Sequence, residues 1–110
     1  MIVTMNTTKE IIKPEVGMGM TERIGSDCYP YTVVNVISDK KIEVTRDTPT
    51  PTKESNYFGS QEYTYESNMD GNRMVLSRRK NGRWYQVGQK MEYWCGFRLG
   101  SRRYYQDPHF

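Results

Sequence analysis

The chain contains no alanine, and its only leucines are Leu76 and Leu99. Alanine and leucine are among the strongest helix formers, so a domain of several helices is hard to build from this sequence. The chain relies instead on Val, Ile, Thr and Tyr, which suit the pleated, half-buried surface of a sheet. This choice of residues predicts an all-β fold.

The length of 110 residues is enough for one domain with one core. Hydrophobic residues make up 35% of the chain, so the core must be thin and Tyr and Met must help to fill it. We expect residues 1–13 to be a short lead-in or edge strand. Residues 14–110 are expected to form a single β domain.

Strand-like patterns occur at short intervals along the chain. They occupy residues 15–23, 31–38, 41–46, 61–66, 73–80 and 83–87, with short last strands expected within 91–99 and 102–105. Residues 24–30 are expected to form a loop, and residues 47–60 a long loop, because prolines and few apolar groups occupy the second. Short strands separated by turn signals favour a small antiparallel SH3-like barrel or sandwich of about five to seven strands.

Two turn signals predict how neighbouring strands pair. Asp70-Gly71 and Asn81-Gly82 both suit two-residue hairpin loops. With such loops, one face of the sheet collects three core residues, Tyr65, Leu76 and Val87. The opposite face pairs Arg79 with Trp84 at the tip of the second hairpin. A slip of one residue in either register would exchange the two faces.

Charge is divided unevenly between the two parts of the chain. Residues 1–66 carry seven Lys or Arg and ten Asp or Glu, for a net charge of −3, whereas residues 67–110 carry nine and three, for +6. Such asymmetry is typical of a protein with one face for an acidic partner. Ordinary solvated charge is the alternative explanation.

The first basic cluster surrounds the Asn81-Gly82 turn. It comprises Arg78, Arg79, Lys80, Arg83, Trp84 and Tyr85. The cations suit a phosphate backbone, and the two aromatic residues suit stacking on bases. In the alternative, structural interpretation, Arg79 lies over Trp84 in a cation–π pair and Tyr85 completes the core.

The second basic cluster lies near the C-terminus. It comprises Arg98, Arg102, Arg103, Tyr104 and Tyr105. Adjacent strand residues point to opposite faces, so only one of Arg102 and Arg103 can join a given surface. A solvated edge strand guarded by charge is the alternative. Together the two clusters are the predicted macromolecule-binding surface.

Residues typical of catalytic and metal sites are scarce. The only histidine is His109, so a nucleophile–histidine arrangement would have to be built on it. Cys28 and Cys95 form no CxxC pair, and we expect two reduced thiols, with a long-range disulfide as the alternative. No ligand spacing points to a metal. We therefore expect no enzyme activity, no metal and no cofactor.

Features of secretion and membrane insertion are also missing. The first thirteen residues lack the basic start and apolar run of a signal peptide. No stretch approaches the roughly 18 apolar residues of a membrane span. We expect no membrane partner.

Three segments of the sequence, taken together, resemble those of a known group of proteins. They are VGMGMT at residues 16–21, SDCYPYTV at residues 26–33 and RRKNGRW at residues 78–84. In this order the chain resembles, over residues 15–105, a group of small proteins encoded by bacteriophages and prophages. No activity is assigned to the group, so no site residue is carried over. The resemblance implies a phage accessory protein in the cytoplasm of an infected bacterium.

Composition and resemblance lead to three function hypotheses. The first is a non-catalytic protein that binds a host protein or nucleoprotein through its basic, aromatic surface and inhibits a defence system such as a CRISPR effector. The second is a module that binds DNA or RNA directly. The third is a sponge that sequesters a small signalling nucleotide in a pocket of Tyr and Arg.

Overall fold

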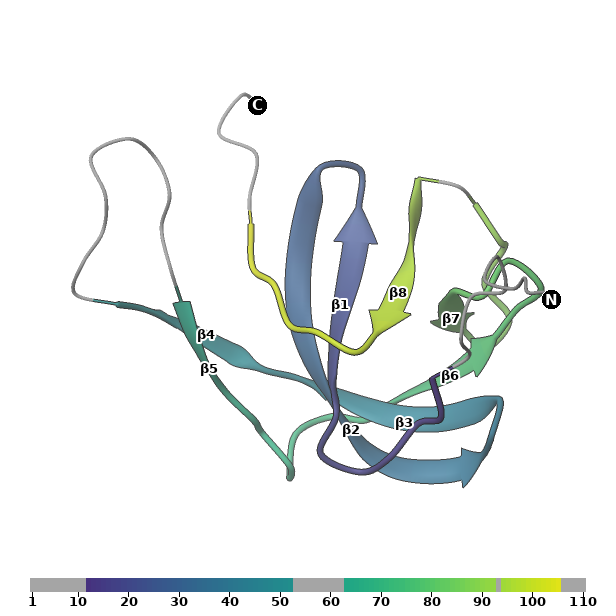
Figure 1. The fold of residues 1–110 in the computed structure, drawn as a ribbon, viewed down its shortest axis with the longest axis horizontal. Helices are drawn as coiled ribbons and strands as arrows, with labels where there is room; N and C mark the ends of the chain where they lie inside the picture. The colour runs from purple at the N-terminus through teal and green to yellow at the C-terminus, as the bar shows by residue number, and fades with distance from the viewer. Residues whose placement is uncertain (1–11, 53–62, 93, 106–110) are drawn as a thin grey trace, which may run out of the picture.

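The computed structural model describes residues 12–52, 63–92 and 94–105, and six of its strands close into an antiparallel barrel (Figure 1). Around the barrel they are β1 (Gly19–Ile24), β2 (Asp27–Ser38), β3 (Lys41–Arg46), β6 (Met74–Arg78), β7 (Trp84–Gln86) and β8 (Cys95–Leu99). β8 pairs with β1 and so completes the ring. The predicted all-β fold and small barrel are confirmed. Among the described residues, no helix is long and apolar enough to cross a membrane.

A separate two-stranded ribbon extends from the barrel (Figure 1). It pairs β4 (Thr48–Pro51) with β5 (Tyr63–Glu66). The prediction of a loop beginning at residue 47 is therefore wrong for β4. Proline is tolerated in this strand because β4 pairs on one side only, so a missing N–H can face away from the ladder. Residues 53–60 of the predicted loop lie outside the described residues, as do residues 1–11 of the predicted lead-in.

The barrel core follows the alternation expected for a half-buried sheet. On β3, Ile42 and Val44 are fully buried, as predicted. Their neighbours in the core come from every barrel strand and include Met20, Tyr31, Val33, Leu76, Trp84, Phe97 and Leu99. Tyr31 meets Phe97 edge to face, with ring centroids 5.0 Å apart. Aromatic rings thus supply much of the volume that an apolar-poor chain needs.

The predicted loop over residues 24–30 is wrong. β1 and β2 form one hairpin in which Ile24 pairs with Asp27, so the turn consists of Gly25 and Ser26. Gly25 adopts a φ of 59°, the left-handed conformation that glycine provides most easily. β2 then continues for 12 residues, with irregular pairing near Val33 and Val36. Such irregularities bend and twist a strand, which allows β2 to curl around the barrel.

The predicted hairpin at Asp70-Gly71 is wrong. A turn is present, because the Gly71 N–H donates to the Asn68 carbonyl, but the strands on either side do not pair with each other. β5 pairs with β4, whereas β6 pairs with β3 and places Leu76 opposite Ile42. Leu76 is buried as predicted. Tyr65 lies on the ribbon and is outside the core.

The predicted hairpin at Asn81-Gly82 exists, but its loop is one residue longer than expected. The Arg79 N–H donates to the Arg83 carbonyl, which leaves a three-residue loop of residues 80–82. Gly82 has a φ of 84°, whereas no non-glycine residue described has a positive φ. Asn81 therefore does not adopt the left-handed conformation that a two-residue type I′ loop would require of it. Arg78 instead pairs with Trp84, and the expected pairing of Arg79 with Trp84 is wrong.

The shifted register changes which side chains are buried. Val87, predicted to lie in the core, is 51% exposed. Trp84 and Tyr85 are both buried, at 2% and 0% exposure. Trp84 belongs to the barrel core, while the Tyr85 hydroxyl donates to the Glu92 carbonyl in the segment that follows β7. The segment after β7 therefore helps to cover the Tyr85 ring.

Candidate nucleic-acid interface

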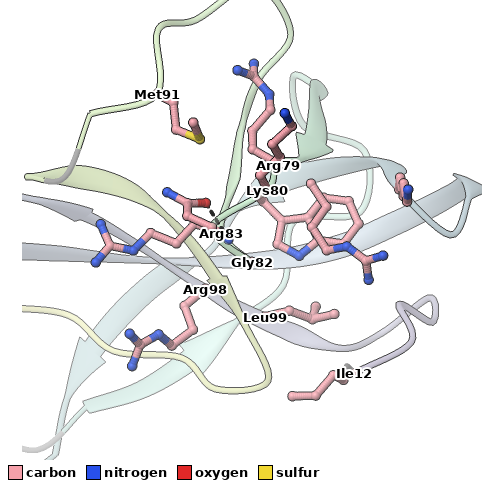
Figure 2. Close-up of a pocket in the computed structure, with 12 residues that line it drawn as sticks. Ile12, Arg79, Lys80, Gly82, Arg83, Met91, Arg98 and Leu99 are labelled. Atoms are coloured by element: carbon pink, nitrogen blue, oxygen red, sulfur yellow. Dashed lines mark hydrogen bonds between the residues drawn. The ribbon is translucent and has the colours of Figure 1, made fainter. Parts of the chain in front are cut away.

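The hairpin cations lie beside a large concavity, which we call the basic groove (Figure 2). It has a volume of about 1090 Å³. Its cationic lining consists of Lys40, Arg78, Arg79, Lys80, Arg83 and Arg98. Ile12, Trp84, Met91 and Leu99 supply its apolar lining. No carboxylate of the described residues lines the groove, so its electrostatic potential favours anions.

Three separate parts of the barrel bring these cations together. Lys40 lies in the turn between β2 and β3, and its carbonyl accepts a hydrogen bond from the Arg78 N–H. The hairpin of β6 and β7 carries the residues from Arg78 to Arg83. Arg98 projects from β8, the next strand around the barrel. Closure of the barrel thus assembles positive charge from positions up to 58 residues apart (98 − 40).

Arg79 is held in place by the fold. Its Nε donates to Ser77 Oγ at 2.9 Å, and its Nη atoms donate to the carbonyls of Gln86 and Gln89. Its guanidinium carbon lies 5.4 Å from the centroid of the Tyr85 ring. Arg79 is therefore a structural residue, but the predicted pair with Trp84 is wrong, because Arg79 lies over Tyr85.

Within the described residues, four other cations of the groove have no anionic partner. Lys40, Arg78, Lys80 and Arg98 form no ion pair with a carboxylate in the part of the chain that the structure describes. Lys40, Lys80 and Arg98 are exposed and Arg78 is half-buried. A groove in which these charges remain uncompensated is suited to bind phosphates.

The predicted stacking role of Trp84 and Tyr85 does not fit their positions. Trp84 is buried because the three-residue loop shifts the register by one residue and places its ring in the barrel core. Tyr85 lies on the opposite face, where the segment after β7 helps to bury it. Tyr85 also accepts a hydrogen bond from Asn81 Nδ2. Among the described residues, two other large aromatic side chains are exposed, Trp94 at 47% and Tyr105 at 39%. Tyr105 was in the predicted surface and Trp94 was not.

The second basic cluster is divided between two faces, but the short strand predicted within residues 102–105 is absent. Residues 102–105 form no continuous strand, and the segment joins the barrel through a bridge between Cys28 and Tyr105. Arg102 forms an ion pair with Asp47, and Tyr104 packs edge to face against Tyr63 on the ribbon. Both are therefore structural residues. Arg103 and Tyr105 face outward, with the guanidinium carbon 5.9 Å from the ring centroid.

A second, smaller hollow of about 430 Å³ lies beside residues 101–105, and we call it the tail pocket. Its lining includes Thr21 and Arg23 of β1, Cys28 of β2, Phe97 and Arg98 of β8, and Ser101, Arg103 and Tyr105 of the C-terminal segment. Arg83 and Arg98 line both hollows. The basic surface therefore continues from the groove across β8 to Tyr105.

Some residues of this surface carry no strong signal in the sequence. Lys40 lies between the strands predicted at residues 31–38 and 41–46, but its position beside Arg78 depends on the pairing of β3 with β6. Arg23 is an exposed residue near the end of β1, and no motif in the sequence singles it out. Neither residue could be assigned to a site before the barrel order was known.

The structure offers no metal centre within the described residues, where no group of three or more His, Cys, Asp or Glu side chains is close enough to hold an ion. Cys28 and Cys95 are free thiols, as expected. His109 lies outside the described residues.

Comparisons of the chain with protein-family models, with curated proteins and with solved structures find no match.

Proposed function

We propose that this protein is a non-catalytic module that binds a nucleic acid by holding its phosphate backbone in the basic groove. The observation that carries the proposal is the convergence of Lys40, Arg78, Lys80 and Arg98 on one concavity that no carboxylate of the described residues lines. Backbone phosphates are closely and regularly spaced, so a strand lying in the groove would meet several of these cations at once.

The separation of these cations also favours a polymer over a single anion. They come from the β2–β3 turn, the β6–β7 hairpin and β8, around a space of about 1090 Å³. A single phosphate would reach only some of them. A polyanion neutralises them together and releases its condensed counterions, which makes its affinity strongly salt-dependent.

Fluorescence anisotropy with a labelled oligonucleotide, single-stranded or annealed to its complement, tests the proposal. If four cations each contact a phosphate, affinity should fall roughly a hundredfold between about 50 and about 200 mM salt. Lys40→Glu and Arg98→Glu should each weaken binding about tenfold at the lower salt concentration. Absence of binding, or binding insensitive to salt, would contradict the proposal.

Lys41→Glu is the matched control for Lys40→Glu. Lys41 is the next residue, is also exposed and does not line the groove. Both variants change the net charge of the chain equally. If the two lower the affinity to the same extent, the effect comes from total charge and the groove is not the site.

The counter-defence hypothesis follows from the resemblance to phage proteins and stays a prediction. The groove is compatible with it, because a defence nucleoprotein presents the phosphates of its bound RNA or DNA. Expression of the protein in a host with an active CRISPR system should then raise phage plaquing, and Arg98→Glu should abolish the gain. Unchanged plaquing would contradict the counter-defence hypothesis but would not contradict direct nucleic-acid binding.

A further inference from the structure

We propose that the tail pocket receives one unpaired nucleotide, with its base against the ring of Tyr105 and its phosphate beside Arg98. The inference rests on the proposed function, because it extends the same surface and names the ligand as a single strand. The two hollows share Arg83 and Arg98, so a strand that leaves the groove across β8 reaches the tail pocket directly.

The size of the pocket suits a nucleotide. Its volume of about 430 Å³ lies in the range of pockets that enclose small ligands. In a duplex the bases are stacked and paired, and only their edges are accessible from the grooves. A base can enter a pocket only from a single strand, a loop or an end, where it can be turned out of the stack.

Tyr105 offers a ring for stacking on a rigid support. Its backbone N–H donates to the Cys28 carbonyl at 2.9 Å, and its own carbonyl accepts from the Cys28 N–H at 2.7 Å. These bonds attach the residue to the edge of β2, while its side chain stays 39% exposed. Bases of any sequence stack on such a ring, since every base has a π face.

The charge around the pocket suits the phosphate of the same nucleotide. Arg23, Arg98 and Arg103 line it, and no carboxylate of the described residues does. The Nε of Arg23 donates to the Gly25 carbonyl at 2.9 Å, which fixes the direction of its guanidinium. Arginine presents a planar set of donors that matches phosphate oxygens. The pocket thus combines an aromatic face with three cations, of which Arg23 is fixed in direction, an arrangement typical of single-strand binding.

The test compares a labelled oligothymidylate with a duplex of the same length, using anisotropy at one low salt concentration. Tyr105→Ala should weaken single-strand binding about tenfold and leave duplex binding unchanged. Tyr105→Phe keeps the ring and should restore wild-type affinity. Trp94→Ala is the control, because Trp94 is a similarly exposed aromatic residue that lines neither hollow.

The outcomes separate this inference from the proposed function. If both nucleic acids bind and the groove variants weaken binding but Tyr105→Ala does not, the tail-pocket assignment is overturned and the groove function stands. An equal loss in Trp94→Ala would also overturn the assignment. If no oligonucleotide binds, the proposed function fails. A rise in melting temperature with thymidine monophosphate in that case would identify a site for free nucleotides and overturn the single-strand inference.

Discussion

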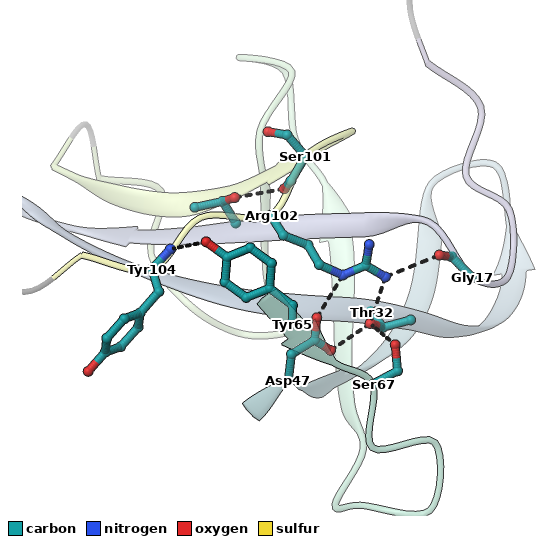
Figure 3. A network of polar contacts seen from close by, with 9 residues as sticks. Gly17, Thr32, Asp47, Tyr65, Ser67, Ser101, Arg102 and Tyr104 are labelled. Atoms are coloured by element: carbon teal, nitrogen blue, oxygen red, sulfur yellow. Dashed lines mark hydrogen bonds and ion pairs between the residues drawn. The ribbon is translucent and has the colours of Figure 1, made fainter. Parts of the chain in front are cut away.

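The guanidinium of Arg102 lies 2.7 Å from the carboxylate of Asp47, whose side chain is completely buried. The two residues are 55 positions apart, and their ion pair joins the C-terminal segment to the start of the ribbon (Figure 3). The same guanidinium donates to Thr32 Oγ1 and to the Gly17 carbonyl. Gly19 leaves room for it, since a Cβ there would lie 2.7 Å from Arg102 Cγ.

Arg102→Ala should destabilise the protein by about 3–5 kcal/mol, because it leaves the Asp47 carboxylate buried without its charged partner. The free energy of unfolding from urea titration measures this. Arg103→Ala is the neighbouring control. Arg103 is exposed, and its replacement should change stability by less than about 0.5 kcal/mol. Equal stability of the two variants would show that the ion pair does not hold the C-terminal segment.

Thr45→Val should stabilise the fold by about 1 kcal/mol. Thr45 Oγ1 is buried and has no hydrogen-bond partner in the part of the chain described, so folding desolvates it without compensation. Valine has nearly the same shape and removes that penalty. The change is measured as a rise in the denaturation midpoint.

Thr32→Val is the matched control for that substitution. Thr32 lies opposite Thr45 in the β2–β3 ladder and is equally buried. Its hydroxyl contacts Asp47, Ser67 and Arg102, so the same chemical change should here destabilise the protein by at least about 1 kcal/mol. If both variants shift stability in the same direction, hydrogen bonding at these positions is not the cause.

Glu22→Gln should make the protein more stable than the wild type at neutral pH, and the difference should disappear in acid. Burial raises the pKa of the Glu22 carboxyl above its ordinary value of 4.5, although the hydrogen bond from Tyr31 and the charge of Arg46 oppose this shift. The unfolded chain therefore ionises Glu22 first as the pH rises. Stability is highest below the ordinary pKa and is lost as the pH rises through the elevated one.

Unfolding free energies of the wild type and Glu22→Gln, measured from about pH 4 to about pH 8, check the sign. The advantage of the variant should grow with pH over this range. The Tyr31 hydroxyl donates to Glu22 Oε1 at 2.9 Å, and a glutamine oxygen can accept the same bond. A difference that stays constant, or one that shrinks as pH rises, would contradict the raised pKa.

Substitution of Arg79 should mainly lower stability, whereas substitution of Lys80 should mainly weaken nucleic-acid binding. Arg79→Ala removes three hydrogen bonds and the contact with Tyr85, and should cost about 2 kcal/mol of stability or more. Lys80→Ala should leave stability within about 0.5 kcal/mol, and should reduce the slope of log affinity against log salt by about 0.7 for a single strand. Thermal unfolding and salt titration of both variants are the measurements.

If Lys80→Ala leaves the slope of log affinity against log salt unchanged, Lys80 does not contact a phosphate. Loss of affinity in Arg79→Ala without loss of stability would likewise show that its bonds to Ser77, Gln86 and Gln89 do not hold in solution.

The all-β fold and most of its strands were predictable from residue types alone. The absence of alanine and the scarcity of leucine disfavour helices. The alternation of Ile42 and Val44 with polar neighbours fits the two-residue period of a strand. The +6 charge of residues 67–110 likewise pointed to the part of the chain that supplies most of the basic groove. These signals act between residues close together in the chain, so the sequence by itself determined them.

Tertiary structure decided which side chains are available to a ligand. Asn81-Gly82 suits loops of either two or three residues, and the choice of the longer loop placed Trp84 in the barrel core and Tyr85 on the opposite face, against the segment after β7. Pairing of β6 with β3, rather than with β5, brought Lys40 beside Arg78, and a buried aspartate drew Arg102 away from the surface. Each outcome depends on contacts between distant parts of the chain. Their free energies appear only once the barrel has closed, and local sequence patterns do not contain them.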